Sequence, residues 1–98
     1  MIRLVRVAPS TDIGEPELTS RLVLAPTSSV SQHLVSFAKS GAVALVVIDV
    51  HPGEQSVFLY ELFVSSKWRR MGFGSATLAA LEVFTVTIGR SIIQLNAV

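Results

Sequence analysis

Half of the 98 residues are hydrophobic and only 15% are charged, so the chain is too apolar to be disordered and long enough for one domain. The net charge of +1, without a run of basic residues, argues against a nucleic acid or a membrane surface as partner. The absence of cysteine excludes disulfides and thiolate metal sites, and two distant histidines make no metal site, so we expect no metal.

The N-terminal quarter of the chain predicts one strand and one loop. Ile2–Ala8 mixes apolar and basic residues in short alternation, which is typical of a strand. Residues 9–16 are rich in turn formers and indicate a loop. Residues 19–25 fit either a strand or an irregular segment, and the pattern does not separate the two.

A helix is predicted over residues 30–40. Ser29 and Gln32 have the spacing of a capping box, and apolar residues follow them at helical intervals. Gly41 then stands where a left-handed residue commonly follows a helix.

The second half of the chain predicts a hairpin, a helix and a last strand. Ala42–Val50 is a continuous valine-rich run, as expected for a strand covered on both faces. Turn residues at 51–55 return the chain as an antiparallel strand, Ser56–Val64. Apolar periodicity predicts a helix over Ser75–Ile88, and Ser91–Val98 forms the last strand. A right-handed crossover through this helix makes the last strand parallel to the strand before it.

A glycine loop joins the strand that ends at Val64 to the following helix. First-turn N–H groups lack intrahelical partners, and the helix dipole adds positive charge there. Gly72 and Gly74 let a phosphate approach the backbone closely, and Arg69 and Arg70 add donors that match phosphate geometry. The arrangement suits a diphosphate.

Spacing decides between diphosphate motifs. The dinucleotide pattern G-x-G-x-x-G fails because Thr77 occupies its third glycine position, and no Gly-Lys-Ser/Thr triplet of a P-loop is present. What remains, Arg69-x-x-Gly72-x-Gly74, resembles the acetyl-CoA motif of the GCN5-related N-acetyltransferases (GNAT). Within the acetyl-CoA motif of residues 60–75, the stretch Tyr60-Glu61-Leu62-x-Val64 followed by Arg69-Arg70-x-Gly72 is similar to the small aminoglycoside acetyltransferases of that superfamily.

The resemblance implies one domain over residues 1–98, with an α/β GNAT-like mixed sheet and helices on its faces, in a truncated acyl-CoA N-acyltransferase fold. It implies acetyl-CoA as cosubstrate, with the pantetheine arm slotted between the last two strands where they splay apart. By position, the arm would pair with the backbone of Leu62, Phe63 and Val64. The pyrophosphate would lie on Arg69, Arg70, Met71, Gly72, Phe73 and Gly74, reaching Ser75.

Glu61 is the only charge in an otherwise apolar nine-residue strand. Burial raises the pKa of a carboxyl group, which suits a general base that takes a proton from an ammonium, and acids on this strand do so in some members of the resembled family. The alternative is a structural glutamate that is hydrogen-bonded to a neighbouring strand or turn.

Other polar and aromatic side chains give weaker signals. Tyr60 is expected in the core with its hydroxyl at the rim, and Trp68 either covers an adenine or caps the core. His33 and His51 are expected in solvent, and Ser65-Ser66 form a loop without a base around them.

Two functions remain open at this point. The first is direct acetyl transfer from acetyl-CoA to a primary amine of unknown identity. The alternative is a non-catalytic acyl-CoA-binding or assembly module with a pared-down GNAT fold. Because the resembled fold continues past the last strand, we expect an exposed edge there and a homodimer through the C-terminal strand. The longest unbroken apolar run is too short to span a bilayer, and no signal peptide is evident. We therefore expect a cytoplasmic protein that does not bind a membrane.

Overall fold

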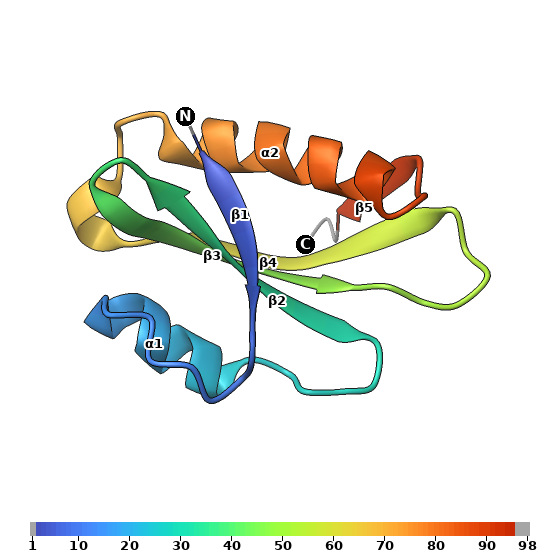
Figure 1. Cartoon of the computed structure of the whole chain (residues 1–98), viewed down its shortest axis with the longest axis horizontal. Coiled ribbons are helices and arrows are strands. Elements are labelled where there is room, and N and C mark those ends of the chain that lie inside the picture. Colours follow the sequence, from blue (N-terminus) through green and yellow to red (C-terminus); the bar gives the residue numbers. More distant parts are fainter. Residues whose placement is uncertain (1, 96–98) are drawn as a thin grey trace.

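The structure, a computed structural model, describes residues 2–95 and forms a five-stranded mixed sheet with one helix on each face (Figure 1). The strand order is β1-β2-β3-β4-β5, antiparallel except for β5, which runs parallel to β4. The elements are β1 (Arg3–Val7), α1 (Pro16–Leu24), β2 (Ser31–Ala38), β3 (Gly41–Asp49), β4 (Ser56–Val64), a 3-10 turn (Ser66–Trp68), α2 (Phe73–Thr87) and β5 (Ile92–Leu95). This confirms the predicted mixed α/β sheet, the β3–β4 hairpin and the parallel crossover through α2.

The two helices bury opposite faces of the same central strands. On one face, α1 and the sheet form a buried cluster of Leu18, Leu22, Ala25, Val35, Leu45 and Val47. On the other face, α2 and the sheet form a buried cluster of Leu34, Val46, Ile48, Val57 and Leu81. Because β2 and β3 contribute to both clusters, the middle of the sheet is apolar on both sides.

The predicted helix over residues 30–40 is wrong, because this segment forms strand β2. Its residues pair with β1 on one side and β3 on the other. Since both faces are buried, apolar residues occupy consecutive positions and imitate helical spacing. Ser28, rather than Ser29, bonds locally, with its Oγ 2.9 Å from Ser31 Oγ. Gly41 has a φ of 123° and opens β3 after the β2–β3 turn instead of ending a helix.

Residues 19–25, expected as a strand or an irregular segment, mostly belong to helix α1. Glu15 is the N-cap and its Oε2 accepts a hydrogen bond from Leu18 N at 3.0 Å. Pro16 takes the first helical position, where its missing N–H costs nothing. Leu18 and Leu22, one turn apart, are the buried residues of the helix.

A β-bulge at Tyr60 changes which side chains of β4 point to each face of the sheet. Val47 pairs with Glu61 and Ile48 pairs with Leu59, so Tyr60 is the extra residue on β4. Its side chain is 54% exposed, and the prediction of a core tyrosine is wrong. A regular strand would place Leu59 and Glu61 on one face. With the bulge, Leu59 packs on the α2 side while Glu61 reaches α1.

Within the described residues, Ile92–Leu95 of β5 pair with Ser56–Leu59 of β4. The last three residues of the predicted strand, 96–98, lie outside the described residues. No helix in the described part of the chain is long and apolar enough to cross a membrane.

Candidate functional site

The loop between β4 and α2 is shaped by two residues with left-handed backbone. Arg70 has a φ of 62° and Gly72, the N-cap of α2, has a φ of 81°. The first hydrogen bond past the cap joins Ala76 N to Gly72 O at 3.0 Å. The N–H groups of residues 73–75 lie ahead of it, and Gly72 has no side chain that could cap them. The loop therefore presents backbone donors at the positive end of a 15-residue helix.

Space for a ligand lies next to these donors. A Cβ placed on Gly72 would meet no atom within 4 Å, so this side of the backbone is open. A Cβ on Gly74 would lie 3.7 Å from Val64 Cγ2, an ordinary contact, so Gly74 packs the start of α2 against the end of β4. The open approach at Gly72 fits the diphosphate that the sequence predicts.

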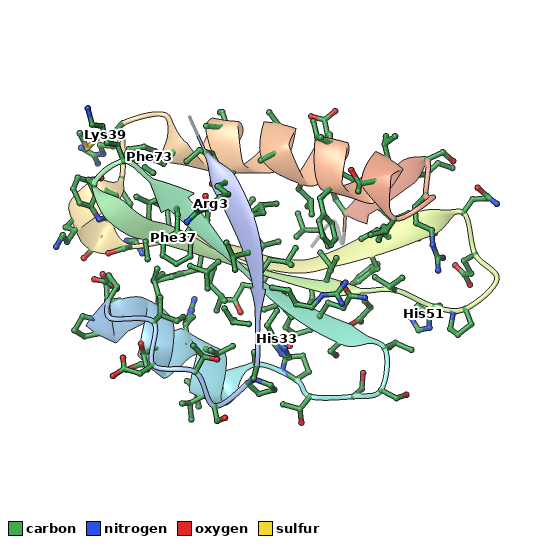
Figure 2. All side chains as sticks on the ribbon, viewed as in Figure 1. Arg3, His33, Phe37, Lys39, His51 and Phe73 are labelled. Atoms are coloured by element: carbon green, nitrogen blue, oxygen red, sulfur yellow. The ribbon has the colours of Figure 1, made fainter. Side chains whose placement is uncertain are left out.

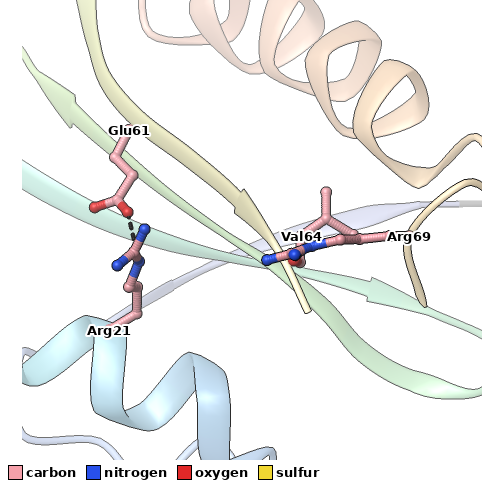
Figure 3. Close-up of polar contacts among 4 residues, drawn as sticks. All are labelled: Arg21, Glu61, Val64 and Arg69. Carbon is pink, nitrogen blue, oxygen red and sulfur yellow. Dashed lines mark hydrogen bonds and ion pairs between the residues drawn. The ribbon is translucent and has the colours of Figure 1, made fainter. Parts of the chain in front are cut away.

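Arg69 closes the turn that follows β4. Its Nε donates to the carbonyl oxygen of Val64 at 3.0 Å (Figure 3). Its guanidinium carbon also lies 5.1 Å from the Phe63 ring centroid. This side chain therefore fixes the loop, while Arg70 is exposed beside it. Contact of either guanidinium with a phosphate stays a prediction. Trp68 is half-buried and packs edge-on against Phe73, with ring centroids 5.9 Å apart.

The end of β4 offers backbone next to this loop. Leu62, Phe63 and Val64 pair with β3 on one side. On the other side of β4, the pairing with β5 ends at Leu59 within residues 2–95. In this part of the chain no strand pairs with Leu62–Val64 on that side. An extended ligand arm could pair with this backbone, as the sequence predicts.

Glu61 faces α1 and forms an ion pair that the sequence did not predict. Its Oε2 lies 2.8 Å from Arg21 Nε (Figure 3). The side chain of Glu61 is 24% exposed and that of Arg21 is 45% exposed. The guanidinium carbon of Arg21 also lies 4.3 Å from the Phe63 ring centroid. Residues 21 and 61 are brought together only by the fold, and residues 19–25 gave no helical signal that could have pointed to Arg21.

Two carboxylates from the start of α1 bind the serines that follow β4. Ser65 Oγ, which is buried, lies 3.1 Å from Glu15 Oε1 and 3.2 Å from Glu17 Oε1. The N–H and Oγ of Ser66 donate to Glu17 Oε1 at 2.7 and 2.6 Å. The expectation of a serine loop without a base around it is therefore wrong, since two carboxylates lie within hydrogen-bond distance of these serines. These contacts tie α1 to the loop that precedes the glycines.

The pKa of Glu17 is lowered from its ordinary value of 4.5, first by the Ser66 hydroxyl and then by the Ser66 N–H. Because the folded pKa lies below the unfolded one, this stabilisation is present above pH 4.5 and is lost as the pH falls through the folded value.

We therefore expect Glu17→Gln to lower the melting temperature at pH 7 and to have a shrinking effect below pH 4.5. Thermal melts across this range, with the exposed turn residue Glu54→Gln as control, measure the difference. An effect of Glu17→Gln that is the same at pH 7 and at pH 3 contradicts a charge-assisted contact.

The histidines lie apart from one another (Figure 2). His33 is only 4% exposed and its Nε2 lies 2.7 Å from the carbonyl oxygen of Pro26, so the expectation of a solvated His33 is wrong. His51 is exposed in the hairpin turn. Among residues 2–95, no three His, Asp or Glu side chains gather in a way that could hold a metal ion.

No protein-family model and no curated protein sequence matches the chain. Among solved structures, it is similar to the ribosomal-protein-alanine N-acetyltransferase of Brucella melitensis biovar Abortus 2308, with a TM-score of 0.74, 16% identity, and coverage of 100% of this chain and 81% of that one. It also resembles a tandem GNAT protein from the clavulanic acid biosynthesis pathway, with a TM-score of 0.72, 17% identity, and coverage of 99% and 37%. The chain has the GNAT fold.

An aminoglycoside 6′-N-acetyltransferase from Acinetobacter baumannii shares this fold with a TM-score of 0.62, 17% identity, and coverage of 100% and 80%. At such identities the GNAT likeness concerns the fold. It confirms the predicted fold class and resemblance.

Proposed function

We propose that the chain is an acetyl-CoA-dependent N-acetyltransferase that transfers the acetyl group directly to a primary amine. The observation that carries this proposal is the loop with left-handed Arg70 and Gly72, which opens α2 directly after the end of β4. Its donors and open space suit the diphosphate of CoA. Two of the three solved structures cited above are named as N-acetyltransferases, one of ribosomal-protein alanine and one of an aminoglycoside, which supports the class of reaction.

Each part of the site has a role in this proposal. The diphosphate accepts hydrogen bonds from the N–H groups at the start of α2, and Ser75 ends this cradle. The pantetheine arm pairs with the backbone of residues 62–64, which aims the thioester along β4 toward the bulge. Backbone N–H groups there polarise the thioester carbonyl and stabilise the oxyanion that develops on it.

The transfer needs one base on the α1 side of β4. The amine nitrogen forms a bond to the acetyl carbonyl carbon, the C–S bond breaks, and its electron pair leaves on the CoA sulfur. Glu61 takes the proton that the ammonium loses before attack, and the nitrogen loses its second proton through water to the departing thiolate, so that CoA leaves as the thiol. The bulge at Tyr60 directs the Glu61 side chain to this side. Release of free CoA that needs both the protein and an added amine tests the proposal.

A module that binds acetyl-CoA without transfer is the second candidate. The Arg21–Glu61 ion pair favours it, because the guanidinium occupies the carboxylate that would receive the proton. Binding of acetyl-CoA without CoA release from any amine identifies this function.

We also propose that two copies of the chain pair through β5. Ile92 and Leu95 on this strand are 52% and 62% exposed, and a hollow of about 390 Å³ lies between α2 and β5. An apolar strand at a sheet edge tends to pair with another chain. Sedimentation at micromolar concentration tests this, and a clean 10.5 kDa monomer contradicts it.

A further inference from the structure

An open hollow lies on the α1 side of β4, and one of its lining residues is Arg21, the ion-pair partner of Glu61. Its volume is about 380 Å³, near the lower end of the range for small-molecule pockets. Its walls come from α1 and β4: Pro16, Glu17, Ser20, Arg21, Leu24 and Phe63. Arg21 belongs both to this wall and to the ion pair with Glu61, so a molecule in the hollow that displaces the Arg21 guanidinium would reach the proposed base.

The carboxylates of Glu17 and Glu61 beside the hollow already have partners. Glu17 accepts hydrogen bonds from Ser65 and Ser66, and Glu61 is paired with Arg21. The guanidiniums of Arg21 and Arg69 lie 4.3 and 5.1 Å from the Phe63 ring centroid. Each of these two carboxylates therefore already has partners. An acceptor whose only charge is an ammonium that replaces Arg21 on Glu61 would leave Arg21 without its partner.

We propose that the acceptor is a zwitterionic amine of the α-amino-acid type, an inference that rests on the acetyl transfer proposed above. Its ammonium replaces Arg21 on Glu61, and its carboxylate pairs with the released guanidinium of Arg21. Every charge keeps a partner in this exchange, whereas an amine without a carboxylate breaks one ion pair and makes only one. Arg21 is then a specificity-determining residue that selects the carboxylate.

The apolar part of the wall indicates the side chain that fits. Leu24 is 79% exposed on α1, and the Phe63 ring forms the floor on β4. An apolar side chain on the amino acid would cover both, which removes apolar surface from water. L-leucine and L-leucinamide are therefore suitable probes, because they differ only in the carboxylate.

The test compares acetyl transfer to the two probes in the wild type and in Arg21→Gln. In the wild type we expect a kcat/KM about 10–100-fold higher for L-leucine, the range given by one charge-assisted hydrogen bond. The amide has the more easily deprotonated amine, so amine basicity works against this result. In Arg21→Gln, kcat/KM for L-leucine should fall by a similar factor, while that for L-leucinamide stays or rises because Glu61 is released.

Arg6→Gln is the matched control, since Arg6 lies on β1 and bonds Gln32 away from the hollow. It should retain the wild-type preference. Equal or faster transfer to L-leucinamide or spermidine, with Arg21→Gln slowing all of them alike, overturns the zwitterion proposal and leaves acetyl transfer standing.

If no amine is acetylated, the proposed function is contradicted. Binding of L-leucine and L-leucinamide then tests the zwitterion proposal. The NMR signal of the Arg21 Nε–H should shift on addition of L-leucine and not on addition of L-leucinamide. An unchanged signal with both probes overturns the proposal.

Discussion

Acetyl-CoA at 100 times its dissociation constant should raise the melting temperature of the chain by about 10–20 °C. A ligand that binds only the folded state at this concentration contributes about 2.7 kcal/mol by mass action. For a domain of this size, each kcal/mol corresponds to about 4–8 °C. A melt with and without acetyl-CoA measures the shift. An unshifted melt of well-folded protein at saturating acetyl-CoA contradicts the proposed cosubstrate.

Gly72→Val should abolish this shift, because the branched side chain would fill the open space beside the helix N-terminus. The substitution also strains the backbone, since Gly72 has a φ of 81°. Gly89→Val is the matched control: Gly89 has a φ of 80°, and a Cβ there also meets no atom within 4 Å. Both variants should melt at a lower temperature than the wild type, but only Gly89→Val should keep the shift with acetyl-CoA. A full shift in Gly72→Val places the diphosphate elsewhere.

Glu61→Gln should lower the rate of acetyl transfer by about 10²–10⁴, the usual contribution of a general base. The amide has nearly the same shape as the carboxylate but cannot take the proton. The melting shift with acetyl-CoA should remain, because Glu61 lies outside the diphosphate loop. Steady-state rates at saturating amine measure the loss, with Glu54→Gln in the exposed hairpin turn as control. Unchanged turnover in Glu61→Gln assigns this residue a structural role through its pair with Arg21.

The parts of the fold that the sequence predicts are those with one dominant local signal. The valine run of β3, the turn at 51–55 and the periodic α2 each agree with the structure in type and position. β2 could not be predicted because burial on both faces conceals its alternation. Helix α1 has nine residues, and its buried residues are Leu18 and Leu22, one turn apart. Its N-cap depends on a hydrogen bond from Leu18 N to the Glu15 side chain, which the local sequence pattern does not reveal.

The candidate site divides in the same way. The diphosphate loop is contiguous, and its glycine spacing can be read directly. The partners of Glu61, Ser65 and Ser66 come from residues that lie 40 to 50 positions earlier in the chain, and only the packing of α1 on the sheet brings them near. The bulge at Tyr60 decides that Glu61 faces α1, whereas a strand pattern with a period of two would place Glu61 on the same face as Leu59, which packs on the α2 side.

The central claim is acetyl transfer from acetyl-CoA to a primary amine, and release of the CoA thiol tests it most directly. The chain is incubated with acetyl-CoA and, separately, with L-leucine, a peptide with a free N-terminus, spermidine and an aminoglycoside. Free thiol is followed in time, and the acetylated amine is identified by mass spectrometry. We predict thiol release that requires protein, acetyl-CoA and amine together, with one acetylated amine formed for each CoA. Thiol release no faster than without protein for every amine, under conditions where acetyl-CoA still shifts the melt, would contradict the claim and assign the chain to acetyl-CoA binding alone.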